Sequence, residues 1–276
     1  MRTDSAKRFL RSQYKAPDYQ FGQVELDFEL MPQRTLVLSR IEVIPSEITQ
    51  TSKDERPLVL DGEDLEFISL RINGQTHRHL ELTPGRLVIH GLPHQGKQRF
   101  VIEIKTACIP ERNTSLMGLY VSRGNFFTQC EAEGFRKITY FQDRPDVMAR
   151  YRVTMRALKA DYPVLLSNGN LIAKEDLADG WHSAIWEDPF PKPSYLFALV
   201  AGKLVCLEDV ITSRSGDKKL LQIWVEPRDL HKTHHAMDSL KRSIIWDEKR
   251  FGLELDLERF MIVAVSDFNM GAMENK

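Results

Sequence analysis

The sequence has little of what would place it in several broad classes of protein. It holds three cysteines, Cys108, Cys130 and Cys206, whose odd number and wide spacing match neither a disulfide scaffold nor a zinc knuckle. Its longest fully apolar runs, residues 196–201 and 260–265, have six residues each, whereas a bilayer-spanning helix needs about 20. Neither sign of charge dominates, since 38 basic residues stand against 39 acidic ones. Nucleic-acid binding and membrane insertion are therefore disfavoured.

The amino-terminal residues predict a cytoplasmic protein. Met-Arg-Thr-Asp-Ser-Ala-Lys-Arg carries basic side chains without an apolar stretch behind them, so it does not resemble a secretory signal. Three unpaired thiols also suit a reducing compartment. The length of 276 residues predicts about two domains, and a content of 42% hydrophobic and 28% charged residues is typical of a globular protein with its own core.

Alternating apolar and polar residues predict a sheet-rich chain up to about residue 200. Residues 24–30 alternate without a fault, which is typical of a strand with one face on a core. Residues 36–44 follow after Pro32 and predict the second strand of an antiparallel hairpin. Further short apolar stretches separated by turn residues predict strands at 58–60, 65–72, 87–89, 100–104, 151–158, 163–166, 181–186 and 195–205. Residues 188–193 hold three prolines and indicate a loop or a strand edge.

The spacing of apolar residues changes after Pro227 from the alternation of strands to the period of a helix. Asp229 is a candidate helix N-cap and Gly252 a candidate stop, and the residues between them carry an apolar stripe at helical spacing, formed by Leu230, Met237, Leu240, Ile244 and Phe251. Residues 220–225 precede this helix as a strand. Residues 260–265 follow it as a continuous apolar run, which predicts a strand buried on both faces.

Most polar clusters along the chain predict no site. His231, His234, His235 and Asp238 share the first turns of the predicted helix, at spacings that could converge on a metal. They also share its outer side with lysines, so a solvated polar face is the favoured interpretation. The sequence contains no glycine-rich phosphate loop, nucleophile elbow or His-Glu-x-x-His motif. No residue is therefore predicted to ligate a metal.

Two segments combine carboxylates with apolar, strand-like flanks. In Gln129-Cys130-Glu131-Ala132-Glu133-Gly134-Phe135 two carboxylates occupy alternate positions, so an extended chain would point both the same way. In Phe268-Asn269-Met270-Gly271-Ala272-Met273-Glu274-Asn275 a carboxylate follows a buried strand, behind a Gly-Ala pair that would let another backbone approach closely. Taken singly, each carboxylate is more often a loop acid than a site. Together they indicate a pocket that holds a cation.

The same two segments resemble a known family. Gly271-Ala272-Met273-Glu274-Asn275 resembles the exopeptidase motif of the aminopeptidase N family of zinc metallopeptidases, the gluzincin aminopeptidases, and Gln129-Cys130-Glu131-Ala132 resembles their substrate-binding loop. The stretch from Gln129 through Arg144-Pro145-Asp146 resembles the bacterial cytoplasmic type in particular. The resemblance implies a mainly β chain, with a saddle-like β domain over residues 1–200 and the start of a thermolysin-like α+β catalytic domain over residues 201–276. It covers the whole chain but only the amino-terminal third of such an enzyme.

The resemblance also implies roles for individual residues. The family removes one residue at a time from free peptide amino termini, so Glu131 and Glu274 would accept hydrogen bonds from the substrate ammonium and Gln129 would shape their pocket. Gly271 and Ala272 would lie against the substrate strand, with Met273 and Asn275 in the same substrate-binding segment. Met270 would line the pocket for the first side chain, although a strand-end core position is the equal alternative.

The family's zinc ligands are absent from these residues. In the family, zinc is held by a His-Glu-x-x-His helix and a later glutamate, which would lie beyond residue 276. We therefore expect these 276 residues alone to bind no catalytic zinc and to hydrolyse nothing. We also expect the uncovered strand at residues 260–265 to be either disordered or paired with a second copy, through which the chain would self-associate. Two alternatives stay open: a non-catalytic scaffold related to the aminopeptidases, and a free-standing β-sandwich binding domain.

Overall fold

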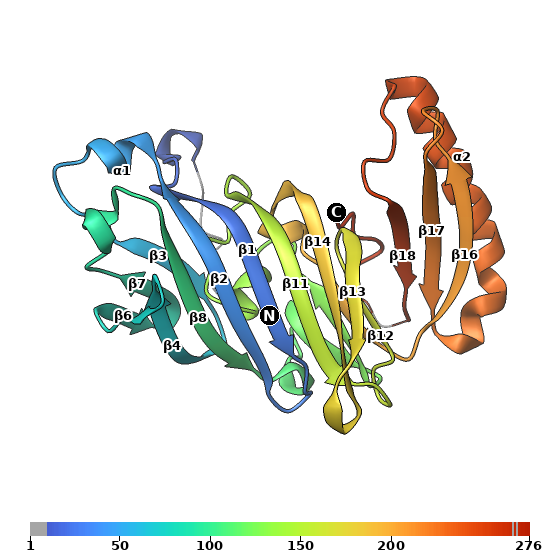
Figure 1. The fold of residues 1–276 in the computed structure, drawn as a ribbon, viewed down its shortest axis with the longest axis horizontal. Coiled ribbons are helices and arrows are strands. Elements are labelled where there is room, and N and C mark those ends of the chain that lie inside the picture. The colour runs from blue at the N-terminus through green and yellow to red at the C-terminus, as the bar shows by residue number, and fades with distance from the viewer. Residues whose placement is uncertain (1–9, 267, 269) are drawn as a thin grey trace.

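The computed structural model describes residues 10–266, 268 and 270–276, and Figure 1 shows their arrangement. Eight strands form one large sheet, in the order β13-β14-β11-β1-β2-β8-β4-β5. Their bounds are β1 Tyr19–Glu29, β2 Thr35–Pro45, β4 Glu66–Ile72, β5 Gln75–Thr76, β8 Phe100–Cys108, β11 Met148–Leu158, β13 Asn170–Asp176 and β14 Trp181–Pro193. The chain is mainly β, as the sequence predicts.

The predicted hairpin at the centre of this sheet is confirmed. β1 and β2 pair antiparallel, with Leu26 opposite Ser39 and Phe28 opposite Val37. Alternate residues of β1 are buried because the apolar half of the pattern faces the core. On its other side β1 pairs with β11 in parallel, a long-range pairing that no local pattern indicates.

Two smaller sheets share one core with the large sheet, which we call the large-sheet core. The first has the order β12-β15-β10-β9 and the second the order β3-β7-β6. Apolar side chains from both pack with those of β1, β2 and β8 in a single cluster. The bounds are β3 Leu58–Gly62, β6 Leu80–Thr83, β7 Gly85–Ile89, β9 Gly118–Ser122, β10 Asn125–Gln129, β12 Val164–Ser167 and β15 Leu199–Gly202; a short helix, α1, spans Glu47–Thr51.

A second, smaller core lies in the carboxyl-terminal part of the described chain. β16 (Val205–Thr212), β17 (Lys218–Val225) and β18 (Arg259–Ala264) form a three-stranded sheet. Helix α2 (Thr233–Phe251) covers the side of this sheet that faces away from the large sheet (Figure 1). Apolar residues of β17 and α2 form its core. The predicted boundary between two domains at residue 200 stays a prediction.

Helix α2 corrects two details of the sequence analysis and confirms a third. Asp229 is not its N-cap, because Pro227 begins a 3-10 helix, Pro227–Lys232, and the α-helix starts only at Thr233. Of the predicted apolar stripe, Met237, Leu240 and Ile244 are buried, whereas Leu230 and Phe251 lie at the two ends and are 38% and 60% exposed. The predicted stop is confirmed, since Gly252 caps the helix in the left-handed conformation at φ 70°.

Strand β18 is less buried than predicted. It pairs in parallel with β17 and is one of the two edge strands of its sheet; none of its residues is fully buried, and Phe260 is 38% exposed. Its two faces nevertheless serve different cores. Met261 and Val263 pack against the large-sheet core and Ile262 packs against the smaller one. Residues 260–265 are therefore apolar because each face of the strand packs against a different core of the chain, and not because the strand is deeply buried.

Candidate functional site

The two motif segments meet in the folded chain. Gln129 is the last residue of β10, and its side chain is 1% exposed. Its Nε2 donates to the backbone oxygen of Glu131 at 3.2 Å and to Sδ of Met273 at 3.8 Å. The second contact joins residues that are 144 positions apart in the sequence. The side-chain Oε1 of Gln129 is buried without a hydrogen-bond partner, so an acceptor is left unused at this junction.

The segment after Gln129 is a tight turn and not an extended chain. Residues 131–134 form this turn, and the peptide between Glu131 and Ala132 is cis. The amide of Gly134 donates back to the carbonyl of Cys130 at 2.7 Å. A Cβ at Gly134 would lie 2.2 Å from the backbone oxygen of Gln129, so only glycine fits this turn.

The turn separates the two carboxylates of this segment. Glu131 is half-buried, whereas Glu133 is exposed and pairs with Arg136 at 3.4 Å. The expectation that both point the same way is therefore wrong, because it assumed an extended backbone. Of the two residues, Glu131 is the one whose backbone lies beside the Gln129 side chain, since Nε2 of Gln129 donates to its backbone oxygen.

The second motif segment is anchored at its end and open in its middle. Nδ2 of Asn275 donates to the carbonyls of Leu196 and Phe197, at 3.2 and 3.4 Å. The ammonium of Lys276 pairs with Asp256 at 2.6 Å and lies 4.7 Å from the centre of the Phe190 ring. The residues before this anchor, Met270, Gly271, Ala272 and Glu274, are exposed, and Met273 is half-buried against Gln129.

Gly271 has free space around it. A Cβ built at this position would meet no atom within 4 Å. Met270, directly before it, is 39% exposed, so it is not a strand-end core residue in the described chain. A peptide backbone can therefore approach this stretch, while Asn275 and Met273 fix its position.

Buried ionisable groups lie under the anchored segment. Lys192 and Asp188 form a salt bridge at 3.0 Å with both side chains almost completely buried, and the Lys192 ammonium lies 4.3 Å from the centre of the Tyr151 ring. Burial lowers the pKa of Lys192 to about 8, and the nearby charge of Lys276 acts in the same direction. Burial also raises the pKa of the Cys130 thiol well above its usual value, so this cysteine stays protonated.

Sequence reasoning missed these supporting residues. Asp188 and Lys192 stand among prolines, in a stretch whose composition indicates only a loop or a strand edge. In the fold this stretch is the end of β14, and its partners come from β11 and from the last described residues. Asp188 and Lys192 are only four positions apart, but the contacts that bury the pair, such as that of Lys192 with the Tyr151 ring, come from segments far away in the sequence, and no local pattern indicates them.

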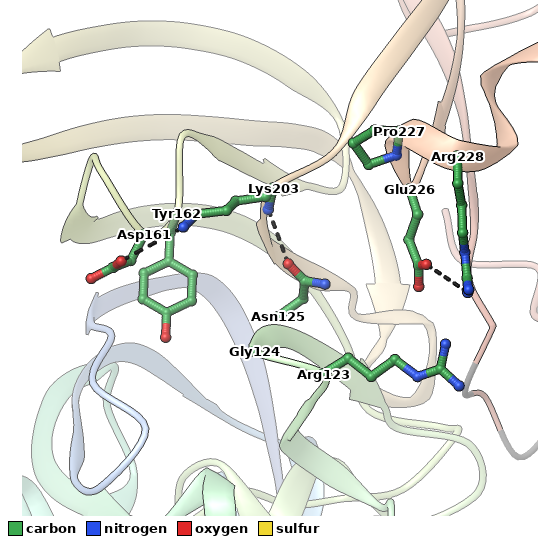
Figure 2. Close-up of a pocket in the computed structure, with 9 residues that line it drawn as sticks. All are labelled: Arg123, Gly124, Asn125, Asp161, Tyr162, Lys203, Glu226, Pro227 and Arg228. Carbon is green, nitrogen blue, oxygen red and sulfur yellow. Dashed lines mark hydrogen bonds and ion pairs between the residues drawn. The ribbon is translucent and has the colours of Figure 1, made fainter.

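A separate hollow of about 590 Å³ is lined by residues that belong to neither motif segment (Figure 2). Its charged side chains are largely paired with one another: Lys203 lies 3.8 Å from Asp161, and Arg228 lies 2.8 Å from Glu226. Among the residues that the structure describes, no three His, Cys, Asp or Glu side chains are placed to hold a metal ion, the histidines of α2 included. Nor is any described helix both long and apolar enough to cross a membrane.

Comparison with known proteins identifies the family. Residues 26–196 match the model of the peptidase M1 N-terminal domain. The chain belongs to this family. The resemblance drawn from the two motif segments is confirmed, since this match covers the first segment and bacterial aminopeptidases N match the chain over 96 to 100% of its length.

Similar proteins include two bacterial enzymes and one solved structure. The chain is 48% identical to aminopeptidase N of Escherichia coli over 96% of its own length, and 46% identical to aminopeptidase N of Caulobacter vibrioides over its whole length. It superimposes with a TM-score of 0.89 on the crystal structure of Legionella pneumophila aminopeptidase A in complex with aspartic acid, at 38% identity and 96% coverage. The chain spans only about 30% of the length of these relatives.

Proposed function

We propose that this chain is the amino-terminal part of a zinc-dependent aminopeptidase, a cytoplasmic hydrolase that removes single residues from free peptide amino termini. Its part in the reaction is to anchor the substrate. The observation that carries the proposal is the contact between Gln129 and Met273, which joins the two segments that would share the substrate ammonium. The aminopeptidase names of the relatives agree with this assignment.

The anchor would act through hydrogen bonds to a charged group. An α-amino group has a pKa of about 7.7 to 8.0, so it is largely an ammonium at neutral pH. We assign its acceptors as the carboxylates of Glu131 and Glu274 and the unused Oε1 of Gln129. Each such bond contributes about 1.5 to 3 kcal/mol. An acetylated amino terminus has no charge and would leave both carboxylates without a partner, so the site would select free termini.

The residues beside Glu274 would hold the substrate backbone and its first side chain. We assign Gly271 and Ala272 to pairing with the substrate as an added strand, a role that their exposure supports. Met270 would line the pocket for the first side chain, where a flexible thioether adapts to several residue types. Met273 and Asn275 would keep the segment in place through Gln129 and the carbonyls at 196–197.

The metal and the general base would come from outside these 276 residues. The described residues do not fit a zinc site, since no three potential ligands converge, and we derive no step through zinc. We propose that residues 1–200 form the anchoring domain and that residues 201–276 begin the catalytic domain. On this proposal the chain alone hydrolyses no amino-terminal amide, and activity that copurifies with it and is lost in Glu274→Ala would contradict the proposal.

A titration of the chain with two related amides tests the anchor. We expect leucinamide to bind weakly, without added zinc, and N-acetyl-leucinamide not to bind. Glu274→Gln keeps the size of the side chain and removes its charge, so it should lower the affinity for leucinamide about tenfold or more. Equal binding of the two amides, or binding that Glu274→Gln leaves unchanged, would rule out the ammonium anchor.

A further inference from the structure

One buried carboxylate connects the two halves of the proposed anchor. Asp143 is 4% exposed and follows the isolated bridge residue Phe141. Its Oδ2 accepts hydrogen bonds from the backbone amide and from Nε of Arg136, both at 3.1 Å, and its backbone oxygen accepts from Nη2 of Arg136 at 3.1 Å. Its Oδ1 accepts from Oγ of Ser194 at 2.6 Å. The two carboxylate oxygens therefore bind two different segments.

On one side Asp143 fixes the turn that carries Glu131. Arg136 lies two residues after Gly134. It belongs to the 3-10 helix Phe135–Lys137, which directly continues the turn. Three hydrogen bonds from one arginine, one of them from its backbone amide, hold the start of this helix in a single orientation. The guanidinium is further balanced by Glu133 at 3.4 Å and by Asp61 at 3.9 Å.

On the other side Asp143 fixes the turn that holds Asn275. Ser194 is 1% exposed and opens the 3-10 helix Ser194–Leu196. The carbonyls of Leu196 and Phe197, at the end of this turn, accept the hydrogen bonds from Asn275. Leu196 also accepts from Nδ2 of Asn168 at 3.0 Å, so the turn is braced from a second strand end.

We propose that Asp143 is a positioning residue that sets the placement of the Glu274 segment relative to the Glu131 turn, through Ser194 on one oxygen and Arg136 on the other. The role of this placement in substrate binding rests on the proposed function. The placement of the two segments by Asp143 does not depend on it. The chain of contacts is continuous: the Glu131 turn, Arg136, Asp143, Ser194, the carbonyls at 196–197, and Asn275 beside Glu274.

Apolar packing alone does not give this placement. Phe135 packs on Phe197 with ring centres 5.2 Å apart and on Phe141 at 4.7 Å, so the same two segments also share aromatic contacts. Such contacts are tolerant of small sliding motions, whereas a carboxylate with both oxygens bonded to different segments fixes direction as well as distance. Burial raises the pKa of Asp143, and the hydrogen bonds from Ser194 and Arg136 oppose that change.

The first test measures placement without any ligand. The methyl group of Met273 lies at the junction with Gln129, and its ¹³C-methyl NMR signal can be assigned with Met273→Leu. Both Asp143→Asn and Ser194→Ala should move this signal toward the position of an exposed methionine. Thr49→Val is the matched control, because it also removes a buried hydroxyl. Oγ1 of Thr49 donates to the carbonyl of Asp18 at 2.7 Å and lies 3.2 Å from Oγ of Ser46, in α1 at the far end of the large sheet (Figure 1).

The second test measures binding. Asp143→Asn and Ser194→Ala should each weaken leucinamide binding about tenfold, and Thr49→Val should not change it. Ser194→Ala keeps the inference testable if Asp143→Asn does not fold. An unchanged Met273 signal in a folded Asp143→Asn or Ser194→Ala variant would overturn the inference. Unchanged leucinamide affinity in these variants would also overturn it, provided that Glu274→Gln weakens the binding of leucinamide to the otherwise wild-type chain. If the wild-type chain does not bind leucinamide, the proposed function fails, and the Met273 signal alone decides whether Asp143 positions the segment.

Discussion

The buried pair of Lys192 and Asp188 predicts how the stability of the chain changes with pH. Lys192 is 1% exposed and its pKa is lowered from 10.5 to about 8, chiefly by burial. Between these two pH values the folded state binds fewer protons than the unfolded state. The free energy of unfolding therefore rises with pH in this window, and the cost of burying the charged ammonium is fully present below pH 8.

The size of the effect follows from the same values. One pKa unit corresponds to about 1.4 kcal/mol, so the charged lysine costs about 3 kcal/mol below pH 8. Between pH 7.5 and pH 10 about 2 kcal/mol of this cost should disappear. The titrations of Tyr19 and Cys108, whose pKa values burial raises to about 12, work in the opposite direction and have to be removed by a control.

The assay is urea unfolding of the wild type and of the double variant Lys192→Met/Asp188→Asn at the two pH values. The double variant replaces both ions with neutral side chains of similar size, so every other titration is common to the two proteins. The stability of the wild type relative to the variant should increase by about 2 kcal/mol from pH 7.5 to pH 10. A difference that stays constant, or falls, would refute the assignment of a buried, destabilising ammonium.

Three further predictions concern the site and the edge of the small sheet. Gly134→Ala should lower the free energy of unfolding by about 1 to 3 kcal/mol, because the new Cβ would collide with the Gln129 carbonyl. The control Gly271→Ala should leave the melting temperature unchanged, because no atom lies near its Cβ. Equal shifts of the melting temperature in the two variants would contradict the assigned turn. Gln129→Leu should reduce leucinamide affinity about tenfold, since it removes the unused buried acceptor, and calorimetry showing no loss would remove Gln129 from the anchor. The outer strand β18 should pair with a second copy, so light scattering should show a dimer that Phe260→Lys, a change at an exposed position, disrupts, and a strict monomer would refute this.

The strands were the most predictable part of the fold. The alternation in residues 24–30 and 36–44 identifies the central hairpin, because one face of each strand lies on the core. The end of α2 at Gly252 was predictable for a local reason, the left-handed cap. The beginning of α2 was not predictable, because two local signals of similar strength compete there. Asp229 favours a helix N-cap, whereas Pro227 favours the 3-10 turn that the structure contains.

The candidate site was predictable only in part. Motif resemblance indicates Glu131 and Glu274, but the contact that joins their segments, from Gln129 to Met273, spans 144 residues and leaves no local pattern. Asp143 shows the same limit more sharply. Its neighbours in sequence give no sign that one of its oxygens binds Ser194, 51 residues further on. Long-range hydrogen bonds of this kind depend on how the sheets pack, which periodicity does not specify.

The most direct test of the ammonium anchor is a crystal structure of the chain with leucinamide bound. We expect the α-ammonium nitrogen within hydrogen-bond distance of Oε1 of Gln129 and of the carboxylates of Glu131 and Glu274, with the amide backbone along Gly271 and Ala272. Leucinamide bound elsewhere, such as in the hollow between Lys203 and Arg228, with the Gln129 oxygen still without a partner, would contradict the account.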